Sequence, residues 1–297
     1  MCGFAGHFIK NGYQHDKDAL HSKIDAALYR RGPDSMGVWN SSTQEVMLHH
    51  RRLRVIGSED SGKQPAHSIN GRYVIAYNGE VYNYQDLADE IELKGENYND
   101  TIVILETISK LGLHDAIKSF NGMFSFALYD RYEDEIILVR DRFGVKPLSY
   151  FIDSSSFIFA SDLRALKCYK NVNLELNHNS IDSVMRYGYV IGNQSIYKHI
   201  KKVAPGSIIR FNIKKHEVKE EKYWDLISVY EDISKNKEII YDQNSALLSL
   251  ENIIRSSVEY RMVSDVPIGA FLSGGIDSSL VTSMMTSIQG SGQNVKT

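Results

Sequence analysis

Cys2 is the residue of this sequence best suited to nucleophilic chemistry, because it directly follows Met1. Removal of Met1 would leave a cysteine with both a thiol and a free α-amino group. An α-amine has a pKa of about 7.7–8.0, so at neutral pH part of it is a free base that can accept the thiol proton. A lone cysteine can equally be a small buried apolar residue. Cys2 is therefore a candidate nucleophile, with packing as the alternative.

Three further groups could act beside such a nucleophile. The Asn78 amide and the Gly79 N–H could donate to one oxygen as an oxyanion hole, although Asn-Gly also predicts a hairpin turn. The run Arg51-Arg52-Leu53-Arg54 could clamp a carboxylate or lie on a solvated strand edge. Asp100 precedes a predicted helix, where it would be an N-cap. Taken alone, each group therefore has a structural explanation.

A glycine-rich loop near the end of the chain could hold phosphate. The sequence Ser273-Gly274-Gly275-Ile276-Asp277-Ser278-Ser279 follows a predicted apolar strand, Val266 to Leu272, and leads into a predicted helix. Glycines let backbone N–H groups approach an anion, and a helix N-terminus favours phosphate. The GxxxxGK(S/T) motif is absent, so the loop is not of the common mononucleotide-binding type.

The pattern around these residues predicts the elements that position them. Residues 1 to about 165 form short strand-like segments with polar breaks, which favours antiparallel sheets covered by helices. Large residues alternate with small ones over 123–129, as in a half-buried strand. Helices are expected over Tyr84 to Lys94 and Thr101 to Leu111, each followed by a glycine that would end it.

The pattern changes after about residue 170. A helix is expected over Ile181 to Tyr187, and a hairpin over Gly206 to Phe211 and Glu217 to Tyr223. Residues 228 to 243 are polar and charged, which is typical of a linker. A helix is then expected over Ser245 to Arg261, and the sheet it introduces would be incomplete at Thr297.

Composition excludes several classes of function. With 34 Lys+Arg, 37 Asp+Glu and a net charge of -3, the chain has no basic excess for a nucleic-acid partner. No apolar run approaches the roughly 18 residues that span a bilayer, and the start lacks the features of a secretory signal. Two cysteines are too few for a disulfide framework, and the histidines lack metal-site spacing. A cytoplasmic protein without a resident metal is expected.

Taken together, the motifs resemble the glutamine-dependent asparagine synthetases. These enzymes join a class II glutamine amidotransferase domain to a synthetase domain built around a pyrophosphate-binding loop, the PP-loop. The resemblance extends over the whole chain, in these blocks: Met1-Cys2-Gly3, Arg31-Gly32-Pro33-Asp34, Arg52-Leu53, Asn78 to Asn83, Gly122 to Ala127, Arg140 to Leu148, Pro205-Gly206, Tyr223-Trp224 and Ser264 to Ser279.

The resemblance implies a glutamine site around Cys2. Cys2 would be the nucleophile with its α-amine as base, and Asn78 and Gly79 would form the oxyanion hole. Arg52 would hold the α-carboxylate of glutamine, while Glu80 and Asp100 would hold its α-ammonium group. The full set of glutamine-binding residues would be Arg52, Leu53, Arg54, Val55, Ile56, Asn78, Gly79, Glu80 and Asp100.

The resemblance also implies an ATP site, where an aspartate carboxylate would be adenylated and then attacked by ammonia to give asparagine. The ATP-binding residues would be Leu272, Ser273, Gly274, Gly275, Asp277 and Ser278. Mg2+ would arrive with ATP, and Asp277 is the candidate ligand. The aspartate pocket would lie beyond Thr297, and a homodimer is possible.

The implied fold is α+β, an αββα sandwich of the N-terminal nucleophile hydrolase type, followed by the beginning of an α/β PP-loop ATP-pyrophosphatase domain. The expected boundaries are 1–190 for the amidotransferase domain, 191–244 for a connecting hairpin and linker, and 245–297 for the synthetase fragment. Two alternatives stay open. The chain could serve another carboxylate acceptor in surface-polymer or secondary metabolism, or it could bind glutamine without turnover. By itself the 297-residue chain is expected to be only a glutaminase.

Overall fold

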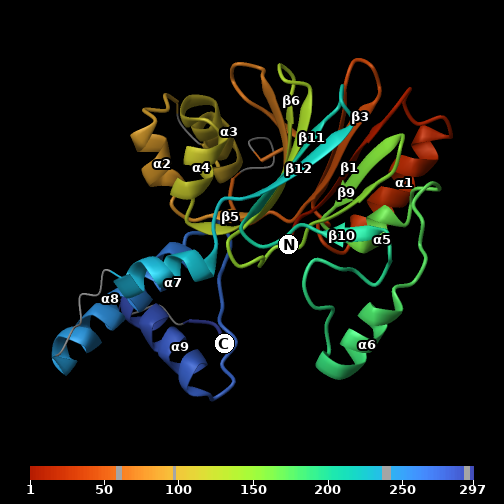
Figure 1. Cartoon of the computed structure of the whole chain (residues 1–297). Coiled ribbons are helices and arrows are strands. Elements are labelled where there is room, and N and C mark those ends of the chain that lie inside the picture. The colour runs from red at the N-terminus through yellow and green to blue at the C-terminus, as the bar shows by residue number, and fades with distance from the viewer. Residues whose placement is uncertain (58–61, 96–97, 236–241, 291–294) are drawn as a thin grey trace. The chain divides into compact units, whose positions relative to one another are not determined.

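The computed structural model extends from Met1 to Thr297 and describes all residues except 58–61, 96–97, 236–241 and 291–294. The chain divides into two compact units, Met1–Asp225 and Leu226–Thr297 (Figure 1). The larger unit contains every residue that the sequence assigns to the glutamine site.

Two six-stranded antiparallel sheets form the centre of the larger unit. The first sheet has the strand order β10 (Ile200–Lys202), β8 (Ser149–Ile152), β9 (Ser156–Ala160), β1 (Gly3–Ile9), β3 (Val46–Arg52), β2 (Ser35–Asn40). The second sheet has the order β12 (Glu217–Lys222), β11 (Ser207–Asn212), β7 (Glu135–Arg140), β6 (Gly122–Asp130), β5 (Tyr73–Val81), β4 (Ala66–His67).

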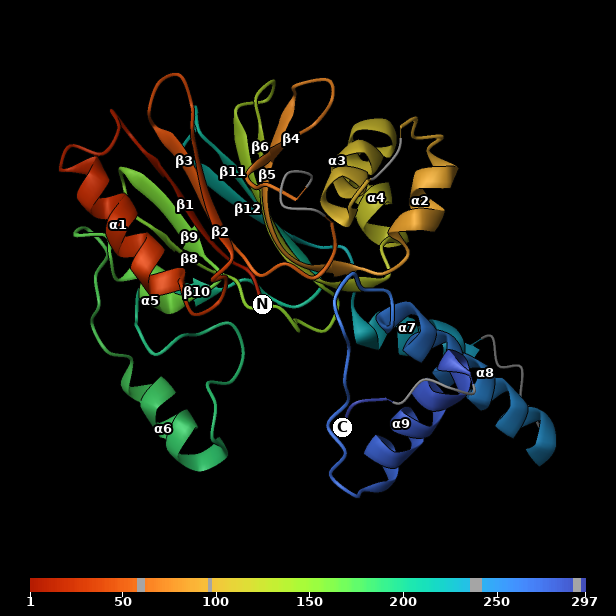
Figure 2. The ribbon, with the colours of Figure 1, turned by 180° about the vertical axis from the view of Figure 1, so that it is seen from behind.

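Helices cover the outer face of each sheet, as the two opposite views show (Figures 1 and 2). On the first sheet lie α1 (Lys17–Leu28) and α5 (Leu163–Leu166), and on the second lie α2 (Tyr84–Glu90), α3 (Asp100–Leu111) and α4 (Leu113–Ser119). Between the sheets, Phe4 and Phe8 of β1 belong to one apolar cluster with Ala76 of β5 and Phe211 of β11. The predicted αββα sandwich is therefore confirmed.

Side-chain alternation along β5 and β6 assigns each residue to one of two cores. Tyr73, Ile75 and Tyr77 belong to the core beneath α2–α4, whereas Val74 and Ala76 lie between the sheets. Phe124, Phe126 and Leu128 of β6 also lie on the helix side, as their alternation predicted. The pleat therefore points successive residues of one strand into different layers.

Two local predictions in this region are wrong. Asn78-Gly79 is not a turn, because β5 stays paired with β6 through Asn78↔Ser125 and Gly79↔Phe124 as far as Val81. Asp100 is not the N-cap of α3. That position belongs to Asn99, whose side chain accepts a hydrogen bond from the Ile102 N–H at 3.0 Å. At Asn78-Gly79, long-range strand pairing has thus overridden a local turn signal.

The larger unit extends beyond the boundary expected at residue 190. β11 and β12 form the predicted hairpin, but β11 also pairs with β7 along its length, from Ile208↔Val139 to Asn212↔Glu135. The hairpin therefore forms one edge of the second sheet and does not belong to a segment that connects two domains. The helix α6 (His178–Tyr187) precedes it and matches the predicted helix over Ile181 to Tyr187.

The smaller unit contains α7 (Leu226–Lys235), α8 (Gln243–Arg261) and α9 (Ile276–Gln289). The expected linker is partly helical, because Ile227, Tyr230 and Ile233 recur at helical spacing in α7. Residues 236–241 of that linker lie outside the described part of the chain. The expected strand Val266 to Leu272 does not form. Among the described residues, its segment makes one parallel bridge, Gly269↔Lys296.

No described helix has both the length and the apolar character needed to cross a bilayer.

Candidate active site

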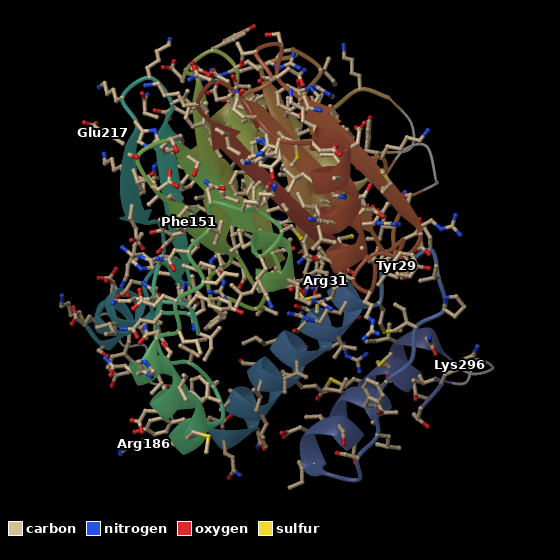
Figure 3. All side chains as sticks on the ribbon, turned by 90° about the vertical axis from the view of Figure 1, so that its right-hand side faces the viewer. Tyr29, Arg31, Phe151, Arg186, Glu217 and Lys296 are labelled. Atoms are coloured by element: carbon tan, nitrogen blue, oxygen red, sulfur yellow. The ribbon has the colours of Figure 1, made fainter. Side chains whose placement is uncertain are left out.

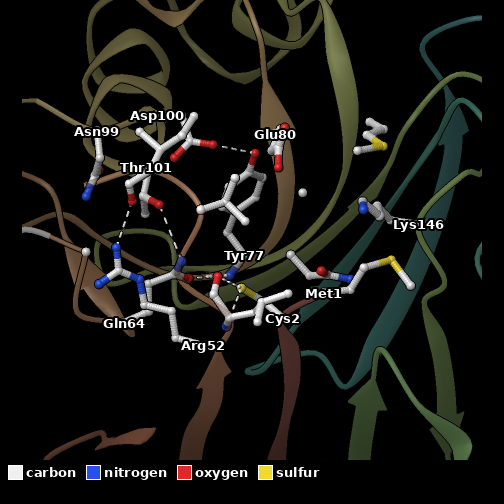
Figure 4. Close-up of a pocket in the computed structure, with 17 residues that line it drawn as sticks. Met1, Cys2, Arg52, Gln64, Tyr77, Glu80, Asn99, Asp100, Thr101 and Lys146 are labelled. Carbon is white, nitrogen blue, oxygen red and sulfur yellow. Dashed lines mark hydrogen bonds between the residues drawn. The ribbon is translucent and has the colours of Figure 1, made fainter. Parts of the chain in front are cut away.

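A cavity of about 240 Å³ opens at the N-terminal end of β1, in the larger unit (Figure 4). Cys2 lines it, together with eight of the nine predicted glutamine-binding residues: Arg52, Leu53, Val55, Ile56, Asn78, Gly79, Glu80 and Asp100. Arg54 is the exception. It is exposed, and its backbone N–H donates to Asp34 Oδ2 at 2.7 Å. The fold thus gathers these eight residues from three separate segments around the Cys2 thiol.

The Cys2 thiol lies against the segment that follows β3. Its Sγ accepts from the Leu53 N–H at 3.4 Å and donates to the Leu53 carbonyl oxygen at 3.6 Å. Burial is the main cause that raises the pKa of this thiol. The thiol is therefore protonated at neutral pH, and a nucleophilic role would need a base close by.

After removal of Met1 such a base would be the α-amine of Cys2. In this structure the N-terminal amine is that of Met1, which lines the same cavity. Desolvation is the largest cause that lowers its pKa, and the charges of Arg31 and Lys146 lower it further, against an opposing effect of Cys2. A lowered pKa leaves more of the amine unprotonated at neutral pH. Arg31 follows the end of α1 (Figure 3), and its Nε donates to the Cys2 carbonyl oxygen at 3.1 Å.

Asn78 and Gly79 lie side by side near the end of β5, on the wall of the cavity. Asn78 is 1% exposed, and its Nδ2 finds no acceptor among the described residues. An unpaired buried amide costs free energy unless a ligand satisfies it. A Cβ on Gly79 would lie 2.3 Å from the Met123 carbonyl oxygen, so this position accepts no side chain. The unpaired Asn78 amide is a donor that can stabilise an oxyanion.

Arg52 ends β3 and holds the loop that follows it. Its Nη2 donates to the Ile56 carbonyl oxygen at 2.8 Å and to that of Gly57 at 3.3 Å. Leu53 to Ile56 form no strand, because these residues curve around the guanidinium group as a loop. Arg52 is buried and faces the cavity, where it can also bind a carboxylate.

Asp100 lies at the first turn of α3 and is buried with Tyr77. The Tyr77 hydroxyl donates to Asp100 Oδ2 at 2.8 Å. Burial is the largest effect on this carboxyl group and raises its pKa. The hydrogen bond from Tyr77, the N–H groups of Val81 and Thr101, and the charge of Arg52 act in the opposite direction. The cavity therefore has a cation at Arg52 and acidic side chains at Asp100 and Glu80, which is the complement of an α-amino acid.

The comparison with known families agrees with this geometry. The family described as "Glutamine amidotransferase domain" matches residues 1–224. The chain belongs to this glutamine amidotransferase family. Residues 249–297 also match the family described as "Asparagine synthase". The family identified from the sequence motifs is thereby confirmed.

Curated relatives of this amidotransferase chain are about twice its length. A protein of Methanocaldococcus jannaschii, provisionally named asparagine synthetase (glutamine-hydrolyzing) 2, is 33% identical over 96% of the chain and 57% of its own length. Amidase chry2 of Gibberella zeae is 28% identical over 96% of the chain and 43% of its own length. The chain thus spans about half the length of these relatives.

Among solved structures, glutamine phosphoribosylpyrophosphate amidotransferase of Bacillus subtilis is similar with a TM-score of 0.53. It is 17% identical, and the match covers 75% of this chain and 49% of the other. At that identity the likeness concerns the fold alone, and it agrees with the αββα sandwich of this amidotransferase.

Two polar residues that line the cavity, Tyr77 and Gln64, were not predicted from the sequence. Gln64 Oε1 accepts from the Tyr77 N–H at 2.7 Å, and Gln64 Nε2 donates to Thr101 Oγ1 at 3.3 Å. Tyr77 resembles a plain core residue of a strand, and Gln64 lies in a loop without any motif. No local signal could have found Gln64.

Lys146 was also missed, although it lies within the motif Arg140 to Leu148. It is 4% exposed and lies on the Met1 side of the cavity, away from Gln64 (Figure 4). Its backbone is fixed at both ends, because the Lys146 N–H donates to Asp141 Oδ2 at 2.9 Å and the Lys146 carbonyl accepts from Arg140 Nε at 2.7 Å. Desolvation lowers the pKa of Lys146, while the charges of Glu80 and Cys2 raise it.

The predicted phosphate loop lies in the smaller unit and leads into α9 as expected. Gly275 is the N-cap of α9 and supplies no side-chain cap, and Gly274 has φ +81, which favours glycine. Ser278 Oγ lies 3.1 Å from both Ser273 Oγ and the Gly275 carbonyl oxygen. Uncapped N–H groups with nearby hydroxyls fit a phosphate group. Leu272 precedes this loop and Asp277 lies within it, in the first turn of α9, and both are exposed.

Proposed function

We propose that the unit Met1–Asp225 hydrolyses the side-chain amide of L-glutamine, with Cys2 as the nucleophile after removal of Met1. One observation carries the proposal. The buried Asn78 amide lacks an acceptor among the described residues and lines the same cavity as the Cys2 thiol. A thiol beside an unsatisfied buried donor is the arrangement that acyl transfer needs.

Glutamine would bind through its amino-acid end. Arg52 would pair with the α-carboxylate, and Asp100 with Glu80 would accept hydrogen bonds from the α-ammonium group. All three side chains line the cavity. This end would hold the substrate so that its side-chain amide reaches Cys2 Sγ.

The chemistry would begin when the free α-amine takes the thiol proton and the sulfur attacks the amide carbon. The oxyanion would be stabilised by Asn78 Nδ2 and the Gly79 N–H. The C–N bond would then break, with the amine returning the proton to the leaving group, to give ammonia and a γ-glutamyl thioester. Water would hydrolyse the thioester to glutamate and restore the thiol.

We further infer that the whole protein transfers this ammonia to an activated carboxylate, with aspartate as the acceptor. The names of the relatives and the match of residues 249–297 support this reaction. Ser273, Gly274, Gly275 and Ser278 would hold the phosphates of ATP, and Asp277 would be the ligand of its Mg2+. When bound, ATP would supply the adenylate that turns the carboxylate hydroxyl into a leaving group.

A different carboxylate acceptor is the second candidate. The relative from Gibberella zeae is named an amidase and no asparagine synthetase, yet it matches the chain over the same 96%. The glutaminase half of the proposal is the same for both acceptors.

The first experiment is release of glutamate from glutamine by the purified 297-residue chain without ATP, with Met1 removal checked by mass. We expect release that Cys2→Ala abolishes and Cys168→Ala leaves unchanged, because Cys168 lies outside the cavity lining. Glutamine binding without release by the processed chain would contradict the proposal and favour a binding module.

A further inference from the structure

We propose that Tyr77 is a positioning residue that holds the Asp100 carboxylate as the acceptor for the α-ammonium group of the substrate, and that Gln64 fixes this pair. The inference rests on the proposed glutaminase function. It names the feature that would make the site specific for an α-amino acid and not for an amide of similar length.

The Tyr77–Asp100 pair joins two elements of the second sheet and its helical layer. Tyr77 comes from β5, Asp100 from the start of α3, and their hydrogen bond measures 2.8 Å with both side chains buried. Both line the cavity, and the bond can be followed in Figure 4. A short hydrogen bond to a carboxylate in a water-poor site restricts its orientation more than an exposed one does.

Gln64 connects the same two elements a second time. Its Oε1 accepts from the Tyr77 backbone at 2.7 Å, and its Nε2 donates to the hydroxyl of Thr101, the neighbour of Asp100, at 3.3 Å. One amide therefore connects the residue that carries the phenol to the turn that carries the carboxylate. This fixes the distance between β5 and the N-terminus of α3 at the cavity.

Tyr77 also acts on the charge of Asp100. Burial raises the pKa of Asp100, and a protonated carboxyl group would bind an ammonium group poorly. The Tyr77 hydrogen bond is the first among the effects that lower this pKa. Burial raises the pKa of Tyr77 itself well above its usual value, so the phenol remains a donor throughout the working pH range.

The test compares two substrates and two phenols. Glutaramate is glutamine without its α-amino group, so it cannot use Asp100. We expect Tyr77→Phe to lower kcat/KM for glutamine about 10- to 100-fold, mainly through a higher KM, because a hydrogen bond to a charged acceptor is lost. For glutaramate we expect less than about a twofold change in kcat/KM.

Tyr73→Phe is the matched control. Tyr73 lies on the same strand and the same side as Tyr77 and is also buried, but it is absent from the cavity lining. Its hydroxyl has no hydrogen bond to the part of the chain that the structure describes. We expect this variant to match the unmodified chain with both substrates. Gln64→Leu is the second variant, and it should raise KM for glutamine less than Tyr77→Phe does while also sparing glutaramate.

The outcomes separate the two proposals. If the unmodified chain releases no glutamate, the proposed function fails. If the unmodified chain is active, but Tyr77→Phe and Gln64→Leu lower kcat/KM equally for both substrates, or for neither substrate, the positioning role is overturned. Should Tyr77→Phe lose its native circular dichroism spectrum, the substrate selectivity of Gln64→Leu decides.

Discussion

In the unit Met1–Asp225 the residues that would handle glutamine are buried or half-buried, apart from Arg54, whereas in the unit Leu226–Thr297 the loop that would bind phosphate is almost wholly exposed. The cause lies in the cores. Two stacked sheets and their helices bury three large apolar clusters in the first unit. In the second unit the described buried apolar residues are Val258, Met284 and Met285.

The two units show how a continuous sequence motif differs from a site assembled in space. Cys2 and Asn78 are far apart in the sequence, and they line the same cavity because β1 and β5 belong to stacked sheets. Ser273 to Ser279 is already continuous in sequence, so its loop forms without much surrounding structure. A continuous motif can be recognised early, but only a large core holds separate side chains to fractions of an ångström.

Loss of a buried ring should give the largest change in stability. Phe211 is fully buried in the first unit, and its ring stacks on Phe157 with centroids 4.5 Å apart. Phe211→Ala should lower the free energy of unfolding by about 3–5 kcal/mol, because it leaves a cavity between the sheets. Urea denaturation followed by circular dichroism measures this. A cost below about 1 kcal/mol would contradict a core of this quality.

Removal of the unsatisfied Asn78 amide should give the next largest effect, which is a loss of catalytic rate. We expect Asn78→Ala to lower kcat for glutamine hydrolysis by about 10²–10³, with a small effect on KM, because the amide would act on the transition state. Steady-state glutamate release checks this. Asn171→Ala is the control, since Asn171 lies outside the cavity lining and bonds to Ser156 Oγ at 2.8 Å. A rise in KM alone would assign Asn78 to binding.

Acid should destabilise the first unit, because three of its histidines are buried, His7, His49 and His50. Burial is the main cause that lowers the pKa of His7 and His50 to about 3 and that of His49 to about 4. These histidines stay neutral in the folded chain, while in the unfolded chain they gain protons below about pH 6.5. Stability is therefore complete above pH 6.5 and is lost as the pH falls towards 4.

The expected loss between pH 6.5 and 5.5 is about 1 kcal/mol for each of the three histidines. Urea denaturation at these two pH values measures it. His7→Gln should weaken the pH dependence by about one third, whereas the exposed His178→Gln should leave it unchanged. Equal stability at both pH values would mean that the three rings are not held neutral.

The smallest effect is expected for the matched phenylalanine of the second unit. Phe271 is 101% exposed, so Phe271→Ala should change the free energy of unfolding by no more than about 0.5 kcal/mol. The measurement is the same denaturation as for Phe211→Ala. A cost similar to that of Phe211→Ala would remove the contrast between the units.

The sequence by itself determined the family, the alternation along β6, and the helices α3 and α9. These depend on short-range features, namely a motif, a period of two or 3.6 residues, and a glycine at a helix end. They therefore survive without knowledge of any neighbour in space.

Only the tertiary structure decided which polar groups meet. Pairing with β6 extended β5 through Asn78 and Gly79, pairing with β7 drew residues 207–222 into the first unit, and a loop contact brought Gln64 to Tyr77. The physical reason is that a strand is stabilised by partners distant in sequence. Local propensity is a weak term against that pairing and burial.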